Sequence, residues 1–387
     1  MKITRVIHPI GQGAFYTETI SDDKGKAFFN VVYDCGSETG KPKVIESYLD
    51  KYYQNSKPKR KIDLVFISHL HNDHINGLNK LFDLTDVKCL ILPQLSNDVV
   101  LEALLYHVVS NGGNWIYLND VILELYFSDG EYRGAKVIQI SNEVGNEEVT
   151  IDPSSPALYD SGSIFQYGDW LYIPYNSPAF KKKKKNSNTS KYDTFYDYFK
   201  FKVNAGEDID LKKIKDLFDL KRNECINAYK DYFGENNQNS YSMVLFSGTR
   251  FPVVMACCKK YCACRSFSDC RCRCYHACVS PNFLYTGDFE PNNKSGSVSN
   301  IDFVKDNLVK LHLWDKISGI QVPHHGSRLN FNSELYVYPY KAYVSVGTTN
   351  QHHHPNIDTL INIQCRSCKS IVVSEDLSSM QIETFDF

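Results

Sequence analysis

Short apolar runs rich in β-branched and aromatic residues recur along the chain and predict buried strands. Ile62–Ile67 is the clearest of them, because Asp63 alone interrupts its apolar character. Other stretches place apolar residues three or four positions apart, which is typical of amphipathic helices. Further strands are predicted over Ala27–Tyr33, Val87–Pro93, Ala135–Ser141, Asp169–Tyr175, Asn239–Phe246, Phe283–Asp288, Gly319–Val322, Tyr343–Val346 and Ile371–Val373, and helices over Pro42–Tyr53, Asp98–Val109, Asp210–Phe233 and Phe303–Leu313. This alternation, followed by consecutive strands, predicts an α/β protein with mixed layers.

Metal-ligand chemistry is concentrated directly after the Ile62–Ile67 strand. Three histidines and one aspartate fall within six residues there: His69, His71, Asp73 and His74. Imidazole and carboxylate together suit Zn, Mn or Fe, and a loop at a strand end is where a rigid scaffold presents functional side chains. The alternative is a polar helix start whose histidines only cap and solvate it. The order, the spacing and the preceding strand favour the metal site.

Candidate partners for this loop follow later strands. Asp288 comes after a Thr-Gly turn at the end of a strand, where a carboxylate can bridge two metals. His324 and His325 follow the strand Gly319–Val322 and offer a closing imidazole. A Gly-Asp turn is common and a histidine pair beside a proline can be structural. Because each candidate lies at the carboxyl end of a strand, their order after the first cluster favours one shared site.

Composition narrows the class of protein. The 387 residues carry a net charge of −2, so a nucleic-acid-binding surface would have to be local. No apolar run approaches the roughly 20 residues that span a bilayer. The first residues enter a strand-like pattern and do not resemble a signal peptide. We therefore expect a cytoplasmic protein without a membrane partner, whose thirteen cysteines act as metal ligands or free thiols.

Two segments interrupt the regular pattern and are predicted to be insertions. The first, at about 177–238, contains five consecutive lysines, Lys181 to Lys185, and the predicted helix Asp210–Phe233. Like charges followed by small polar residues usually form a solvated loop, although such a run can also attract an anionic polymer.

The second insertion, at about 251–280, is rich in cysteine. Thiolate clusters suit structural zinc, and two tetrahedral sites use about eight ligands. Interleaved lysines and arginines leave two roles open, a purely structural zinc clip and a basic knuckle that recruits nucleic acid. An iron–sulfur centre is a lesser alternative. The predicted ligands are Cys257, Cys258, Cys262, Cys264, Cys270, Cys272, Cys274 and Cys278.

Several motifs resemble one family in combination. The H-x-H-x-D-H pattern at 69–74 resembles the metallo-β-lactamase fold superfamily. The wider set resembles the branch that contains the metallo-β-lactamase-like domain of the competence protein ComEC and related phosphodiesterases, and it extends from near residue 3 to near residue 375. That set comprises Gly11-Gln12-Gly13, Asp34-Cys35-Gly36, Asn239 with Ser242-Met-Val-Leu, Thr286-Gly287-Asp288, Pro323-His324-His325-Gly326-Ser327, and Ser345-Val346-Gly347 followed by His354-Pro355.

The resemblance implies one hydrolase domain over residues 1–387, an αββα sandwich with the two insertions and two divalent ions, Zn or Mn. His69, His71 and Asp288 would hold the first ion, and Asp73, His74, Asp288 and His325 the second. The chain departs from the wider superfamily because Asn239 and Ser242 stand where many members have a third histidine for the first metal. Asp73 would also orient a bridging hydroxide nucleophile, His354 would act as a second catalytic residue, and the residues expected to bind substrate are Asn239, Ser242, His324 and Ser327.

The resemblance further implies a phosphodiesterase or nuclease acting on nucleic acid or a nucleotide messenger. A second enzyme class remains open, the hydrolysis of a carboxyl ester, lactam or thioester by the same hydroxide. A third hypothesis is a nucleic-acid-binding module whose metals are structural. Fold alone does not decide among them.

Overall fold

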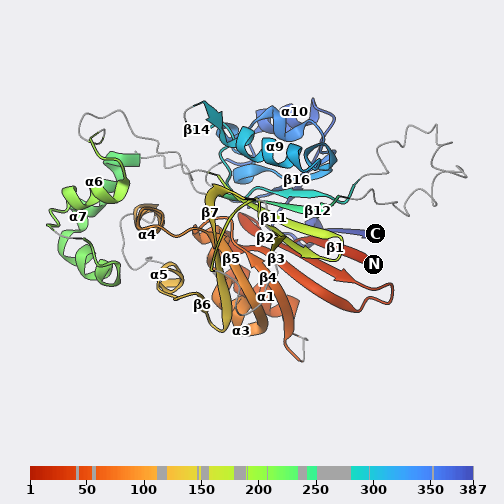
Figure 1. The fold of residues 1–387 in the computed structure, drawn as a ribbon, viewed down its shortest axis with the longest axis horizontal. Coiled ribbons are helices and arrows are strands. Elements are labelled where there is room, and N and C mark those ends of the chain that lie inside the picture. Colours follow the sequence, from red (N-terminus) through yellow and green to blue (C-terminus); the bar gives the residue numbers. More distant parts are fainter. Residues whose placement is uncertain are drawn as a thin grey trace, which may run out of the picture.

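The structure is a computed structural model, and it describes residues 1–40, 43–54, 58–110, 120–145, 148–149, 157–177, 189, 191–206, 208–233, 242–250, 280–295, 297–350 and 353–386. Within these ranges two large sheets pack face to face (Figure 1). The first sheet has the order β19–β1–β2–β3–β4–β5–β7–β6, with β9 paired to β7. Its strands are β1 (Lys2–Ile7), β2 (Gly13–Ser21), β3 (Ala27–Ser37), β4 (Arg60–Phe66), β5 (Thr85–Pro93), β6 (Glu131–Tyr132), β7 (Ala135–Val144), β9 (Leu158–Ser161) and β19 (Gln381–Asp386).

The second sheet has the order β18–β17–β16–β13–β12–β11–β10–β8. Its strands are β8 (Glu148–Val149), β10 (Ile164–Tyr167), β11 (Trp170–Asn176), β12 (Met243–Thr249), β13 (Phe283–Tyr285), β16 (Gly319–Gln321), β17 (Lys341–Ser345) and β18 (Lys369–Val373). A small hairpin, β14 (Lys294–Ser295) with β15 (Val298–Ser299), precedes helix α9.

Helices cover the outer face of each sheet. Helices α1 (Lys43–Tyr53) and α3 (Leu78–Leu84) lie against the first sheet, and α9 (Asn300–Lys310) and α10 (Ile357–Gln364) against the second (Figure 1). One apolar core fills the space between the sheets. A second lies between the first sheet and its helices, and a third lies between the second sheet and its helices. The predicted αββα sandwich is therefore confirmed.

A group of helices stands at one side of the sandwich. Helix α4 (Asn97–Ser110) packs against α5 (Asp120–Tyr126), α6 (Phe195–Lys202) and α7 (Ile214–Phe233). The side chain of Thr194 caps α6 by accepting a hydrogen bond from the amide of Asp197 at 3.0 Å. None of the helices in the described ranges is long and apolar enough to cross a membrane.

The single helix expected over Asp210–Phe233 is divided in the structure. A short 3-10 turn covers Leu211–Lys213, and α7 then bends at Lys221, whose φ and ψ are −134° and 42°. The Lys221 ammonium group donates a hydrogen bond to the carbonyl of Val203 at the end of α6. This contact with α6 accompanies the bend, which apolar spacing alone does not signal.

The insertion boundaries at about 177–238 and 251–280 stay predictions. Residues Lys181 to Lys185 and the eight cysteines from Cys257 to Cys278 lie outside the described residues.

Candidate metal centre

The candidate site lies where carboxyl ends of strands from both sheets meet. The loop after β4 carries His69 and His71 and leads into the short helix α2 (Asn72–Ile75). Asp288 follows β13, and His325 lies in a 3-10 turn (Pro323–Gly326) after β16. The amide of Met243, the first residue of β12, donates to the carbonyl of Ser68 at 2.8 Å and so ties the two sheets together beside the site.

Four buried side chains form a group able to hold a metal ion. Ligand atoms of Asp73, His74, Asp288 and His325 all lie within 4.8 Å of one another. The Nε2 atom of His325 is 3.0 Å from Oδ2 of Asp73, and Nε2 of His74 is 3.5 Å from the same oxygen. These are the four residues that the resemblance implied for the second metal, and the structure brings them together.

The two carboxylate oxygens of Asp288 face different histidines. Oδ1 lies 3.3 Å from Nε2 of His74 and 3.9 Å from Nε2 of His325. Oδ2 lies 3.7 Å from Nε2 of His69 and 3.8 Å from Nε2 of His324. Asp288 therefore stands between two groups of imidazoles, as a bridging carboxylate would.

The donor set fits divalent cations. The Nε2 atoms of His69 and His74 are buried and make no hydrogen bond within the described structure, an arrangement that is costly unless another partner binds them. Mixed imidazole and carboxylate ligands suit Zn, Mn or Fe. Burial lowers the pKa of His69 to about 3, so this ring is a neutral donor.

Outer contacts orient the imidazole rings. The Nδ1 atom of His74 lies 2.7 Å from Oδ2 of Asp34, and that carboxylate also accepts hydrogen bonds from the amide and hydroxyl of Ser68 at 2.7 and 2.8 Å. The Nδ1 atom of His325 donates to the carbonyl of Ser345 at 2.7 Å. Because Nδ1 carries the proton in that contact, Nε2 of His325 keeps the lone pair that a metal needs.

The turn that carries His325 has an unusual backbone. His324 and His325 both adopt left-handed conformations, with φ of 48° and 52°. Such conformations are strained for residues other than glycine and are concentrated at functional sites. The amide of His324 donates to the carbonyl of Gly287 at 3.0 Å, which fixes the turn against the Asp288 segment. A Cβ atom at Gly287, where φ is 50°, would lie 2.6 Å from the side chains of Ser68 and Ser242.

The carboxylates and the imidazoles of the centre shift each other's pKa values. Burial alone would raise the pKa of Asp73, but His74 and His325 outweigh burial and hold this pKa well below its usual value. Burial alone would lower the pKa of His74, whereas Asp73, Asp34 and Asp288 together raise it well above its usual value. A proton and a metal ion therefore compete for His74, and acid weakens metal binding.

His71 occupies a different position from the other ligand candidates. Its Nε2 atom faces the Glu102 carboxylate on α4, with Oε2 at 4.0 Å. Its ring lies flat on Tyr106, with centroids 3.8 Å apart and planes at 7°. The ring centroid of His69 is 4.7 Å from that of His71. His107 is buried and contacts the carbonyl of Leu70 through Nε2 at 3.1 Å.

The residues expected to contact substrate are distributed around this centre. The Ser242 hydroxyl donates to the carbonyl of Thr286 at 3.2 Å and accepts from the amide of Asp288 at 3.0 Å, so it positions the Asp288 segment. The His354 ring lies 5.7 Å from that of His324. Ser327 is buried, and its amide donates to the carbonyl of His324 at 2.9 Å. Asn239 is outside the described residues. The substrate roles of Ser242, His324, Ser327 and Asn239 stay predictions, as does the catalytic role of His354.

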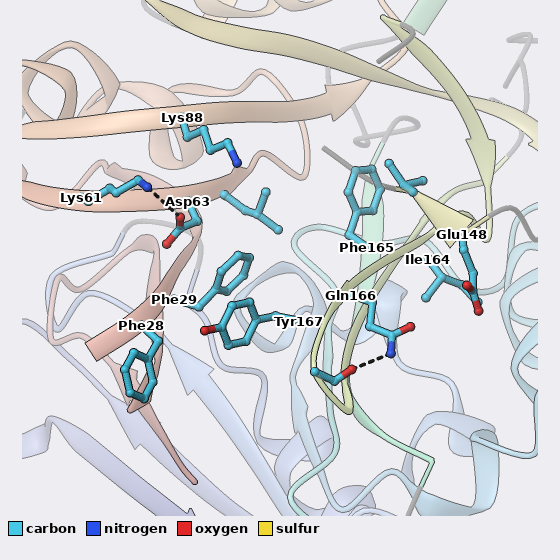
Figure 2. Close-up of a pocket in the computed structure, with 13 residues that line it drawn as sticks. Phe28, Phe29, Lys61, Asp63, Lys88, Glu148, Ile164, Phe165, Gln166 and Tyr167 are labelled. Carbon is cyan, nitrogen blue, oxygen red and sulfur yellow. Dashed lines mark hydrogen bonds and ion pairs between the residues drawn. The ribbon is translucent and has the colours of Figure 1, made fainter. Parts of the chain in front are cut away.

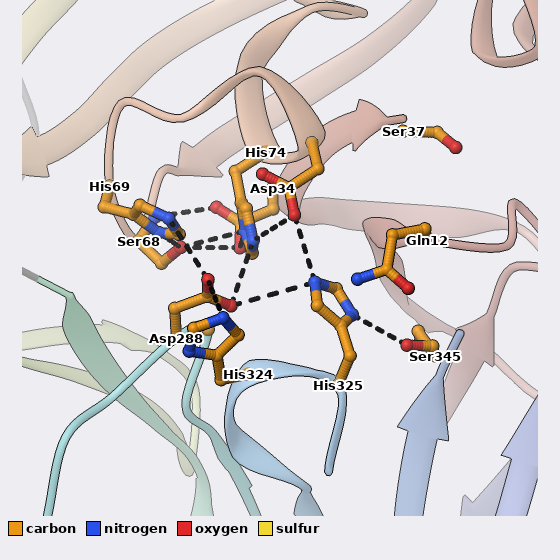
Figure 3. A network of polar contacts seen from close by, with 12 residues as sticks. Gln12, Asp34, Ser37, Ser68, His69, His74, Asp288, His324, His325 and Ser345 are labelled. Carbon is orange, nitrogen blue, oxygen red and sulfur yellow. Dashed lines mark hydrogen bonds and ion pairs between the residues drawn. The ribbon is translucent and has the colours of Figure 1, made fainter. Parts of the chain in front are cut away.

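Several neighbours of the centre are not indicated as such by the sequence. Asp34 lies within β3, where its φ is 55°. In the sequence it follows an apolar run, as the first residue of an ordinary turn also can, and its place before Cys35-Gly36 is the one signal of a role. Glu102 and Tyr106 lie in a predicted amphipathic helix, where a polar residue among apolar ones is ordinary and does not indicate a metal site. Gln12 is buried, its Oε1 makes no hydrogen bond within the described structure, and its amide lies beside His325 (Figure 3).

A separate cavity of about 680 Å³ lies between the two sheets (Figure 2). Phe29 stacks on Tyr167 in its wall with centroids 4.6 Å apart, and Lys61 pairs with Asp63 at 3.7 Å. Lys61 in the cavity wall is six residues before Ile67, where the ligand loop begins. Six residues of extended strand span about 20 Å. The cavity shares no lining residue with the metal-ligand group, so it is not part of the candidate metal centre.

Comparison with known proteins supports the family at the superfamily level. The family model described as Metallo-beta-lactamase superfamily matches residues 29–91, which include β4 and the ligand loop. No curated protein matches the chain. Together with the αββα fold, this match supports the metallo-β-lactamase superfamily, whereas the ComEC-like branch stays a prediction.

Solved structures align with this chain at low sequence identity and with TM-scores below 0.5. Unliganded yeast PDE1 aligns over 100% of both chains with 11% identity and a TM-score of 0.42. A long form RNase Z from yeast aligns over 98% of this chain and 41% of its own, with 11% identity and a TM-score of 0.35. A diphosphatase from the PhnP family aligns over 100% of this chain and 99% of its own, with 11% identity and a TM-score of 0.37.

Proposed function

We propose that this chain is a metal-dependent hydrolase of phosphodiester bonds that works with two divalent ions, Zn or Mn. The observation that carries the proposal is the placement of Asp288, whose oxygens lie 3.3 Å from Nε2 of His74 on one side and 3.7 Å from Nε2 of His69 on the other. A carboxylate between two imidazole groups fits a pair of ions. Sites with two metals about 3.5–4 Å apart serve phosphatases and nucleases, because the pair can stabilise both the attacking and the leaving oxygen.

The ligand residues for one ion are grouped more closely than those for the other. Asp73, His74, Asp288 and His325 would hold one ion, since their ligand atoms are already grouped. His69, His71 and Asp288 would hold the other. Ions bound here would supply Lewis-acid chemistry by acidifying a water molecule and offsetting negative charge on phosphoryl oxygens.

The chain's own side chains orient the reaction. Asp73 lies within the cluster and would accept a hydrogen bond from the attacking water. Asp34 and the Ser345 carbonyl hold His74 and His325 in orientation. His354, beside His324, would donate to a phosphoryl oxygen, and so would the buried amide of Gln12. No serine or cysteine nucleophile is required.

Nucleic acid or a nucleotide messenger is the proposed substrate class. The lysines at 181–185 and the basic residues among the cysteines at 257–278 would attract a polyanion through phosphate contacts.

We also propose structural zinc in the cysteine-rich segment. The described residues beside that segment, Thr249 and Asn282, are joined by two hydrogen bonds at 2.8 and 3.0 Å. Thr249 lies six residues along β12 from Met243, which is beside the metal centre. Six residues of strand span about 20 Å, so this end of β12 is about that far from the metal centre.

A substrate panel tests this function. Purified protein is incubated with bis-p-nitrophenyl phosphate, single- and double-stranded DNA, RNA, cyclic dinucleotides and p-nitrophenyl acetate, with Mn or Zn and with a chelator. We expect phosphodiester hydrolysis that the chelator abolishes and added metal restores, and zinc beyond two ions per chain by metal analysis. Hydrolysis of the carboxyl ester alone would replace the proposal by the ester-hydrolase alternative. Nucleic-acid binding without turnover would support the binding-module alternative.

A further inference from the structure

Helix α4 holds the ligand loop from outside the sandwich. Three of its side chains reach the segment 69–74: Tyr106 stacks on the His71 ring, His107 contacts the carbonyl of Leu70, and Glu102 faces Nε2 of His71. Their positions, four and one residues apart, bring them to neighbouring faces of the helix. Tyr106 thus covers the flat face of the His71 ring, and Glu102 of the same helix faces one of its nitrogens.

The helices of the predicted first insertion also pack against α4. Helices α6 and α7 pack against α4 in one continuous apolar core (Figure 1). Asp98, in the first turn of α4, accepts a hydrogen bond from the amide of Tyr196 in α6 at 2.8 Å. Tyr229 of α7 reaches Glu102 itself, donating from its hydroxyl to Oε1 at 3.5 Å.

These contacts form a buried polar chain from the insertion to a candidate metal ligand. Tyr229, Glu102 and His71 are 1%, 5% and 3% exposed. One carboxylate oxygen of Glu102 faces Tyr229, and the other faces His71. A carboxylate beside Nε2 favours the proton on that nitrogen, which leaves the lone pair of Nδ1 for a metal ion. Carboxylates that hold ligand histidines in this way typically contribute 10- to 100-fold to metal affinity.

We propose that Glu102 is a positioning residue for the His71 ring and that Tyr229 of α7 holds its carboxylate, so that the helical insertion supports the first metal site. The inference rests on the proposed metal centre. It assigns a role to the insertion that needs no contact with substrate.

The test is a calorimetric titration of chelator-treated full-length protein with Mn²⁺. Wild-type protein is expected to bind two ions. Glu102→Gln keeps the shape of the side chain but removes its charge, and it should weaken one of the two sites about 10- to 100-fold while leaving the other unchanged. Tyr229→Phe removes one hydrogen bond and should weaken the same site about 2- to 10-fold.

A matched control lies one turn further along the same helix. The Tyr232 hydroxyl is also buried but makes no hydrogen bond within the described structure, so Tyr232→Phe should bind both ions as wild type does. Thermal unfolding of each chelated variant reports any general loss of packing. Unchanged affinities in Glu102→Gln, equal weakening of both sites, or Tyr229→Phe behaving like Tyr232→Phe would overturn the inference. Wild-type protein that binds no Mn²⁺ would instead refute the metal centre, and the inference with it.

Discussion

Replacing Asp288 with asparagine is expected to lower phosphodiester hydrolysis about 1,000-fold or more, because several kcal/mol of charge stabilisation depend on the metal pair. Asp288 is 2% exposed, and its two oxygens face His74 and His325 on one side and His69 and His324 on the other. The amide of asparagine is neutral and offers one acceptor oxygen where the carboxylate offers two. Initial rates on bis-p-nitrophenyl phosphate at saturating Mn²⁺ measure the loss.

The control for this variant is Asp63→Asn. Asp63 is also buried, on strand β4 of the first sheet, and it accepts a hydrogen bond from the amide of Asn30 at 3.0 Å, away from the metal-ligand group. Its replacement should leave the rate within a few-fold of wild type. Near wild-type turnover in Asp288→Asn, with the circular dichroism spectrum unchanged, would remove Asp288 from the reaction.

Replacing Arg5 with methionine is expected to lower the free energy of unfolding by about 3–5 kcal/mol, since it leaves the buried Glu18 carboxylate without its cation. Arg5 is 1% exposed and pairs with Glu18 at 2.7 Å and with Glu383 at 3.4 Å. It also donates to Tyr285 of the second sheet at 3.1 Å and to the carbonyl of Pro281 at 3.0 Å. The guanidinium thus joins β1, β2 and β19 to the facing sheet. Urea denaturation in the presence of chelator measures the change without any contribution from metal.

An exposed ion pair provides the comparison for Arg5. Arg133 pairs with Asp83 at 3.1 Å, but the two side chains are 40% and 63% exposed. Water screens such a pair, so Arg133→Met should change the free energy of unfolding by about 0–1 kcal/mol. If both variants lost less than 1 kcal/mol, Arg5 would not join the two sheets in the way described.

The signals in the sequence that indicate the ligand loop are local. His69, His71, Asp73 and His74 lie together directly after an apolar strand, so composition and spacing alone indicate a metal site. The αββα fold is likewise predictable from the alternation of strands and helices together with the resemblance. Whether Asp288 and His325 lie beside this loop depends on the order of the strands in the two sheets. The resemblance implies that order, but the periodicity of apolar residues does not.

Contacts that depend on tertiary packing are harder to predict. Asp34 is one acidic residue after an apolar run, and its role depends on parallel pairing of β3 with β4, which places it beside Ser68 and His74. Glu102 and His71 are 31 residues apart, and Tyr229 comes from α7, which bends at Lys221 where that side chain contacts the end of α6. The strand β19 pairs with β1 across nearly the whole chain, so its short alternating pattern carries little information by itself.

The central claim is that Asp73, His74, Asp288 and His325 hold a divalent ion. Anomalous diffraction from crystals grown with Mn²⁺ tests it most directly. We predict a peak about 2.0–2.3 Å from the ligand atoms of these four residues, with a second peak on the His69 side of Asp288. A map with manganese bound elsewhere and no peak among these four side chains would contradict the account.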